Sequence, residues 1–158
     1  MKKRYSYQEA LSKVQRYCAY QERAHSEVRE KLFEYGIYER EVDEILTELI
    51  TSGFLNEERF AKAFAGGKFR MKKWGRIKII HALEAKGVSP NCIRSGLKEL
   101  DDAAYAETLH EILTKKNQEL AEDNIYSHRD RLAKYAIQKG YEPELTWAVV
   151  KSLLPDQR

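Results

Sequence analysis

The sequence contains few of the residues that mark secreted or membrane-bound proteins. Only two of its 158 residues are cysteines, only three are prolines, and no apolar run is longer than four residues. Without a longer apolar run, a membrane-spanning helix is excluded. Cys18 and Cys92 form no C-x-x-C pattern, which favours unpaired thiols in a reducing compartment. The basic start, residues 1–4, is followed by polar residues rather than by the apolar segment of a signal peptide. We therefore predict a cytoplasmic protein with no membrane partner.

The usual catalytic and metal-binding patterns are also missing. The four histidines are dispersed, without a His-x-x-x-His pair, and no cysteine stands at metal-ligand spacing. Neither a G-x-x-x-x-G-K-[ST] loop nor a G-x-G-x-x-G segment occurs. Asp101-Asp102 is predicted to cap a helix, and Cys92 is predicted to be a buried, inert thiol rather than a nucleophile. We therefore expect no enzymatic activity, no cofactor and no metal.

A glycine that recurs at the end of a helical segment is the most informative feature present. Gly36, Gly87 and Gly140 lie 51 and 53 residues apart, and apolar residues keep register with them. Four residues before the glycines stand Leu32, Leu83 and Ala136. Ten residues after them stand Leu46, Leu97 and Val150, and thirteen residues after them stand Leu49, Leu100 and Leu153. This period indicates a repeated supersecondary unit, and such repeats build extended binding surfaces more often than buried active sites.

Capping signals divide each unit into three helices. Ser6 and Glu9 form a capping box, Ser26 can cap the following helix, and Asn56 can start the second unit. Ser89-Pro90 and Pro143 place proline at the first turn of later helices. No segment alternates with period two over enough length to form a sheet. The sequence thus predicts an all-α, elongated tandem array of three three-helix repeats, at residues 5–53, 54–101 and 102–155.

Basic residues are concentrated in the second repeat. Between Arg59 and Leu83 there are eight Lys or Arg residues and no acid, whereas the remainder carries 20 basic and 25 acidic residues, a net charge of −5. Such a block attracts polyanions, and aromatic side chains beside cations can stack on unpaired bases. The alternative is a solvated helix face with Phe69 and Trp74 in the core. The predicted binding residues are Lys68, Arg70, Lys72, Lys73, Trp74, Arg76 and Lys78.

Two consecutive glycines, Gly66 and Gly67, precede the densest part of this block. Each costs a helix roughly 1 kcal/mol relative to alanine. Either a break or hinge at this point, or close packing against another helix, is expected.

Three stretches resemble signatures of the RecX regulatory proteins. Residues 23–32, RAHSEVREKL, resemble the first-unit signature, and residues 54–61, FLNEERFA, resemble the second-unit opening. Residues 74–88, WGRIKIIHALEAKGV, are similar to a family segment of Gly, then Ile, then Leu-x-x-Lys-Gly-Ile. The third unit is similar only in helical pattern and in its glycine. The chain departs from the family at Trp74, at the two consecutive glycines, and at residues 115–124, which look like a lengthened connection.

This resemblance implies a function as well as a fold. RecX proteins are bacterial cytosolic modulators of the RecA recombinase, built from three-helix units that look like helix-turn-helix folds. They lie in the groove of the RecA–DNA filament and restrain ATP hydrolysis and strand exchange, in recombination, DNA repair and the SOS response. The resemblance therefore implies a monomeric, non-enzymatic RecA regulator that also contacts single- and double-stranded DNA independently of sequence.

An autonomous DNA-binding protein of helix-turn-helix type, for example a transcription factor, is the alternative. Such a protein reads base edges with Arg, Asn or Gln at the start of a recognition helix. The third helices of the first and third units instead begin with acidic residues, which repel phosphate: Glu41, Asp43, Glu44, Glu142 and Glu144.

Overall fold

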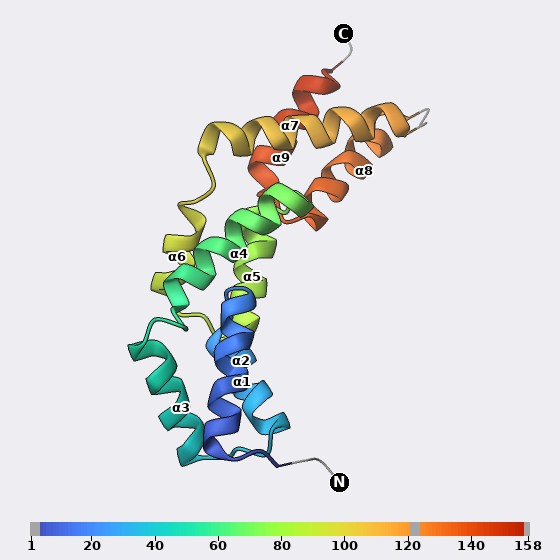
Figure 1. Cartoon of the computed structure of the whole chain (residues 1–158). Coiled ribbons are helices and arrows are strands. Elements are labelled where there is room, and N and C mark those ends of the chain that lie inside the picture. The colour runs from blue at the N-terminus through green and yellow to red at the C-terminus, as the bar shows by residue number, and fades with distance from the viewer. Residues whose placement is uncertain (1–3, 121–123, 157–158) are drawn as a thin grey trace. The chain divides into compact units, whose positions relative to one another are not determined.

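The computed structural model describes residues 4–120 and 124–156, and Figure 1 shows how the chain runs through them. These residues form nine α-helices and no strand, which confirms the all-α prediction. The helices are α1 (Tyr7–Tyr20), α2 (His25–Glu34), α3 (Arg40–Thr51), α4 (Glu57–Lys72), α5 (Arg76–Ala85), α6 (Pro90–Leu97), α7 (Asp102–Glu119), α8 (Ile125–Gln138) and α9 (Pro143–Leu153).

Contacts within the chain divide it into two compact units. Unit 1 comprises residues 1–64 and 83–96, and unit 2 comprises residues 65–82 and 97–158. Helices α1 to α3 therefore lie in unit 1 and helices α7 to α9 in unit 2, whereas α4 and α5 each contribute residues to both units.

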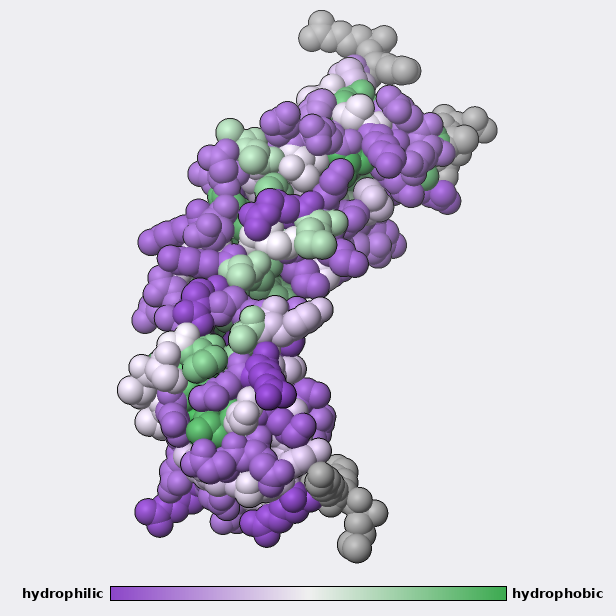
Figure 2. Space-filling model, in the orientation of Figure 1, coloured by the Kyte–Doolittle hydropathy of each residue, from purple (hydrophilic) through white to green (hydrophobic). Residues whose placement is uncertain are grey.

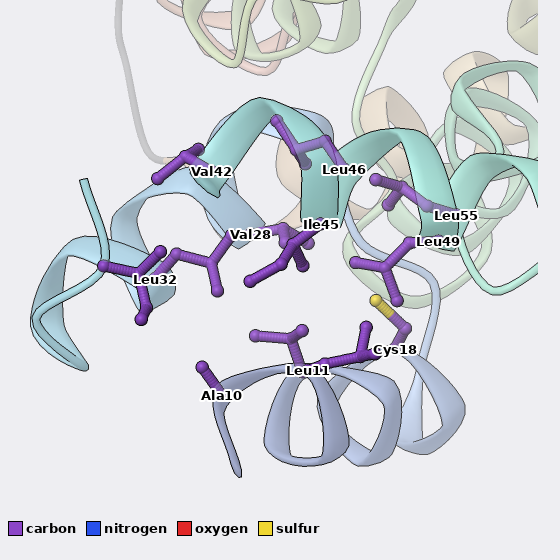
Figure 3. Packing of buried hydrophobic residues seen from close by; sticks show 12 residues of the cluster. Ala10, Leu11, Cys18, Val28, Leu32, Val42, Ile45, Leu46, Leu49 and Leu55 are labelled. Carbon is purple, nitrogen blue, oxygen red and sulfur yellow. The ribbon is translucent and has the colours of Figure 1, made fainter. Parts of the chain in front are cut away.

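The core of unit 1 is built where α1, α2 and α3 pack against one another. Apolar residues on α1 recur at helical spacing, as Leu11, Val14 and Cys18 do, and this places them on one buried face. Figure 3 shows the α1 side chains of Leu11 and Cys18 facing those of α2 and α3. Burial raises the pKa of the Cys18 thiol to about 11, so this cysteine stays protonated and acts as a small apolar residue. The buried cluster contains Ala10, Leu11, Val14, Cys18, Val28, Leu32, Ile37, Val42, Ile45, Leu46, Leu49 and Leu55.

The core of unit 2 joins α7, α8 and α9 to the second half of α4 through aromatic rings. The ring of Phe69 stacks on that of Tyr105, with centroids 5.8 Å apart, and Tyr105 meets Tyr141 at 5.0 Å. All three rings are buried, so Phe69 belongs to the core, as the alternative interpretation of the basic block proposed.

The three repeated glycines end the middle helices α2, α5 and α8, as predicted. Gly36, Gly87 and Gly140 have φ angles of 81°, 77° and 103°, the left-handed conformation in which a glycine commonly ends a helix. The amide of the next residue then donates to a carbonyl five residues back, as Ile37 does to Leu32 at 2.9 Å and Tyr141 does to Ala136 at 3.1 Å.

Most helix starts also agree with the sequence. Ser6 and Glu9 form both hydrogen bonds of the capping box, and the Asn56 side chain accepts a hydrogen bond from the Arg59 amide. The prediction for Ser26 is wrong. Ala24 is the N-cap residue of α2, which begins at His25, and the Ser26 hydroxyl instead donates to the Lys86 carbonyl at 2.7 Å.

Helix α4 continues through Gly66 and Gly67 without a break, so the predicted interruption is wrong. Close helix packing is not the reason for the glycines either. A Cβ on Gly67 would have no neighbour within 4 Å, and one on Gly66 would meet only the guanidinium of Arg70, at 2.8 Å. Gly66 thus gives room to the side chain of Arg70 on its own helix, and no contact in the structure explains Gly67.

The expected lengthened connection is in part helical. Helix α7 runs to Glu119, and Asn124 caps α8 by accepting hydrogen bonds from the amides of Tyr126 and Ser127. Residues 121–123 of the expected connection lie outside the described residues.

Polar residues cover most of the face drawn in Figure 2, and hydrophobic residues appear there only in small, separate areas. None of the described helices is long and apolar enough to cross a membrane.

Candidate nucleic-acid interface

The turn between α4 and α5 positions the centre of the predicted basic site. Helix α4 ends where Lys73 adopts a left-handed conformation, φ 57°, and its amide donates to the Phe69 carbonyl at 2.9 Å. The hydroxyl of Tyr141 donates to the Lys73 carbonyl at 2.9 Å. Because lysine seldom adopts this conformation, the turn is held by its partners in unit 2 rather than by local preference.

Trp74 follows Lys73 in this turn and is half-buried. The ammonium group of Lys68, on α4, lies 5.0 Å from the centroid of its ring, and that of Lys78, on α5, lies 4.7 Å away. Both distances are within the range of a cation–π interaction. The indole therefore gathers two cations from different helices around one turn.

The other predicted cations of this region are exposed on the last turn of α4 and in the turn itself. They are Arg70, Lys72 and Lys73. Lys78 is likewise exposed on α5. The structure thus brings Lys68, Trp74 and Lys78 together, and Arg70, Lys72 and Lys73 lie exposed along the same helix end and turn.

Arg76, the seventh predicted site residue, has a different environment. Its guanidinium pairs with Glu142 at 2.7 Å and with Asp102 at 2.9 Å, and it lies 3.8 Å from the centroid of the Tyr105 ring. Its backbone amide donates to the Tyr105 hydroxyl at 3.0 Å. Arg76 therefore connects the start of α5 to α7 and α9 within unit 2.

Glu142 completes this network as the acceptor for two donors. Its carboxylate accepts hydrogen bonds from Arg76 and from the Tyr105 hydroxyl. Burial by itself raises the pKa of Glu142, but the hydrogen bonds from Tyr105 and Arg76 outweigh it, so the pKa lies below its ordinary value. Burial and the bond to Glu142 together raise the pKa of Tyr105, so its hydroxyl remains a donor at neutral pH.

Two more cations of the basic block are paired in space. Arg59 donates to the Glu22 carboxylate at 2.7 Å, and Lys62 lies 3.3 Å from Glu58, one helical turn earlier. Counting acids along the block therefore overestimated its positive charge. The remaining five cations are here called the basic surface: Lys68, Arg70, Lys72, Lys73 and Lys78.

A close backbone contact fixes this surface to the third predicted repeat. The Gly75 amide donates to the Lys139 carbonyl at 2.8 Å, and the Ile77 amide donates to the Gly140 carbonyl at 2.9 Å. A Cβ on Gly75 would lie 2.3 Å from the Gly140 carbonyl carbon, so only glycine fits there. Sequence reasoning missed these partners, although an isolated glycine between two helices is a signal for close backbone approach.

The described residues offer little for catalysis. Among residues 4–120 and 124–156, no three His, Cys, Asp or Glu side chains are grouped so that they could hold a metal ion. Asp101 caps α7 by accepting from the Ala104 amide at 2.9 Å, as predicted. Cys92 is half-buried rather than buried, and its thiol lies 3.7 Å from the Glu57 carboxylate.

Tandem three-helix units whose middle helices end at glycine, with a basic surface at one inter-helix turn, define a helical repeat protein. Sequence models of two RecX domains match this chain: the first three-helix domain matches residues 10–49, and the second three-helix domain matches residues 56–97. The chain belongs to the RecX family.

Curated relatives agree with this assignment. The regulatory protein RecX of Clostridium perfringens (strain 13 / Type A) is 31% identical over 134 residues, which cover 80% of this chain and 60% of the relative. The regulatory protein RecX of Prosthecochloris aestuarii is 28% identical over 145 residues, which cover 92% of this chain and 93% of the relative. The chain thus spans about 60% of the length of the Clostridium relative.

Solved structures share the fold. The crystal structure of RecX from Lactobacillus salivarius has a TM-score of 0.83 at 20% identity, over 93% of this chain and 96% of that one. A second crystal structure, of a regulatory protein RecX, has a TM-score of 0.80 and covers 92% of this chain.

Proposed function

We propose that this chain regulates the RecA recombinase by binding the RecA–DNA filament, without an enzymatic activity of its own. Binding along the filament groove restrains the cycle of RecA protomers and so slows ATP hydrolysis and strand exchange. Membership of the RecX family supports the regulatory role. The observation that supports the DNA contact is the basic surface, which has five cations on α4, α5 and the turn between them, two of them beside Trp74.

The chemistry of this surface suits a DNA backbone. Lysine ammonium groups and an arginine guanidinium neutralise phosphates and release counterions, which needs no base sequence. Trp74 holds two of these ammonium groups beside its ring. Arg76 is left out of the proposed surface because Glu142 and Asp102 already pair with it.

The size of the DNA contact can be estimated. One face of α4 presents only part of the five cations to a ligand, so three contacts are realistic. At about −0.7 per phosphate of single-stranded DNA, the basic surface alone should then contribute roughly −2 to the slope of log affinity against log salt. We expect the chain to bind unrelated DNA sequences with similar affinity.

The measurement that tests the regulatory role is the DNA-dependent ATPase of the cognate RecA on preformed filaments. We expect substoichiometric amounts of the chain to slow ATP turnover, because a ligand that bridges protomers restrains several of them at once. The triple variant Lys68→Gln, Lys72→Gln, Lys78→Gln should inhibit less at equal concentration. A matched control, Lys13→Gln, Arg16→Gln, Lys98→Gln, removes three exposed cations elsewhere and should inhibit as the wild type does. An unchanged ATPase at saturating protein, without cosedimentation with filaments, contradicts the proposal.

The alternative, an autonomous helix-turn-helix DNA-binding protein, gains no support from the third helices. Helices α3 and α9 carry acidic residues in their first turns, Asp43 and Glu144 among them. In α6 the Arg94 guanidinium is hydrogen-bonded to the Asn91 side chain, the two groups that would read bases there. Strong preference for one DNA sequence in a binding selection would favour this alternative instead. We expect a monomeric chain in the cytoplasm, and neither feature is needed for the ATPase test.

A further inference from the structure

A second cluster of cations lines a cleft in unit 2. The cleft has a volume of about 380 Å³ and lies between the end of α4, the second half of α7 and the end of α8. Four lysines line it: Lys73, Lys115, Lys116 and Lys139. Glu111 and Glu119 also contribute, so the lining keeps two positive charges in excess.

Tyr135 orders two of these lysines. The ammonium group of Lys116 lies 4.8 Å from the centroid of the Tyr135 ring, and that of Lys139 lies 5.7 Å from it. Lys116 also lies 3.7 Å from Glu119, and Lys139 donates to the Lys72 carbonyl at 3.5 Å. The aromatic ring thus holds two ammonium groups at one wall of the cleft.

The positive field in the cleft is not fully compensated. Burial lowers the pKa of Lys139, and the nearby charges of Lys78 and Lys73 lower it further. Cations crowd one another at this end of α4 and α8, and a bound anion would relieve their repulsion.

We propose that this cleft holds backbone phosphates of a single DNA strand that also crosses the basic surface. Lys73 belongs to both, so a strand bound at the end of α4 has its next phosphate partners in the cleft. The inference deepens the proposed function, and rests on it for the identity of the ligand as DNA.

The lining explains why a polynucleotide fits better than other ligands. Small-molecule sites are mostly apolar, whereas Ile112 is the one aliphatic side chain among the described residues that line this cleft. All of its cations are lysines, whose flexible ammonium groups follow a phosphate in varying positions. Carboxylates of an acidic protein are more often held by the two-pronged guanidinium of arginine, and none of the lining residues that the structure describes is an arginine.

The test measures anisotropy of a labelled oligothymidylate with the full chain over a range of salt concentrations. The cleft variant is Lys115→Gln with Lys139→Gln, since an amide at residue 139 can still donate to the Lys72 carbonyl. Its matched control is Lys134→Gln with Lys151→Gln, two exposed lysines that do not line the cleft. Removing two phosphate contacts should weaken binding on the order of tenfold at physiological salt and flatten the salt slope by roughly 1.4. The control should match the wild type.

The outcomes separate this inference from the proposed function. If the cleft variant binds DNA as the wild type does while the triple variant of the basic surface binds weakly, the cleft inference is overturned and the proposed function stands. If the cleft variant loses only binding to RecA filaments, the cleft holds an acidic protein surface and its assignment to DNA is overturned. If the double variant unfolds at a lower temperature than its control, the single exposed change Lys115→Gln decides, with a flattening of roughly 0.7 expected.

Discussion

Lys73 combines a strained backbone with a proposed contact to DNA. Its φ angle of 57° costs a residue with a side chain about 1–2 kcal/mol relative to glycine. We expect Lys73→Gly to raise the free energy of unfolding by up to about 1 kcal/mol, because part of that gain is lost to the greater freedom of glycine in the unfolded chain. The same variant should weaken DNA binding, because a cation is lost. Urea unfolding and anisotropy titrations measure the two effects.

The companion variant Lys73→Ala separates charge from conformation. It removes the same cation but keeps the strain, so it should weaken DNA binding equally without a gain in stability. Wild-type affinity in both variants would show that the cation of Lys73 does not meet DNA, and would leave its backbone conformation as a structural feature alone.

Glu142 makes unit 2 sensitive to acid. The pKa of Glu142 in the folded protein lies below the ordinary 4.5. Its contribution to the free energy of unfolding is therefore fully present above pH 4.5 and is lost as the pH falls through the pKa of the folded state. At pH 7 we expect Glu142→Gln to reduce the free energy of unfolding by about 1–2 kcal/mol, the range for hydrogen bonds to a partly exposed charged group. The difference from wild type should shrink progressively as the pH falls below 4.5. A difference that stays constant as the wild type is titrated from pH 7 down to its acid unfolding would contradict the assignment.

The pairing of charged side chains is the residue-scale feature that the sequence predicts poorly. The block of cations without an acid was visible in the sequence, but its pairing was not. Arg59 meets Glu22 and Arg76 meets Glu142, partners 37 and 66 residues away. No local pattern encodes such pairs, because the fold brings them together. Lys68 and Lys78 lie beside the Trp74 ring because the chain turns there from α4 to α5, and their contact with DNA stays a prediction.

At the scale of elements, the helices and their glycine ends could be predicted because their causes are local. Apolar spacing, capping side chains and glycines in the left-handed conformation all act within a few residues. The two wrong predictions, for Ser26 and for Gly66 and Gly67, have causes that local sequence does not show. Ser26 is drawn to the carbonyl of Lys86, 60 residues away, and Gly66 accommodates the folded-back side chain of Arg70. A glycine pair therefore need not mark a break when the rest of the helix is well packed.

The equivalent glycines of the second and third repeats should differ in their tolerance to substitution. A Cβ on Gly87 would meet no atom within 4 Å, whereas one on Gly140 would lie 2.6 Å from the backbone nitrogen of Lys78. Gly87→Ala should therefore cost only the left-handed strain, about 1–2 kcal/mol. Gly140→Ala should cost clearly more, because the backbone contact beside Gly75 must also open. Thermal or urea unfolding of the two variants measures this difference, and equal losses would contradict the close contact at Gly140.

At the scale of the whole molecule, sequence predicted the repeated units and their family, since both rest on patterns that recur along the chain. It did not predict that α4 and α5 contribute residues to two compact units. That division depends on contacts such as Phe69 with Tyr105 and Ile77 with Gly140, which join the second half of α4 and the start of α5 to α7 and the end of α8. The basic surface and the lysine cleft both belong to unit 2 for this reason.

Arg76 allows the independence of the two units to be tested. Its partners Asp102, Tyr105 and Glu142 all lie in unit 2, while the buried cluster of α1 to α3 is made of unit 1 residues alone. Arg76→Ala should reduce the stability of unit 2 by about 2 kcal/mol, because Glu142 and Tyr105 lose a charged partner. Native-state hydrogen exchange should then show faster exchange in α7 to α9 and unchanged exchange in α1 to α3. Arg70→Ala, at an exposed residue of the basic surface, should leave both sets unchanged. If exchange in α1 to α3 accelerates as much as in α7 to α9, the two units unfold together, and the network around Arg76 stabilises the whole chain.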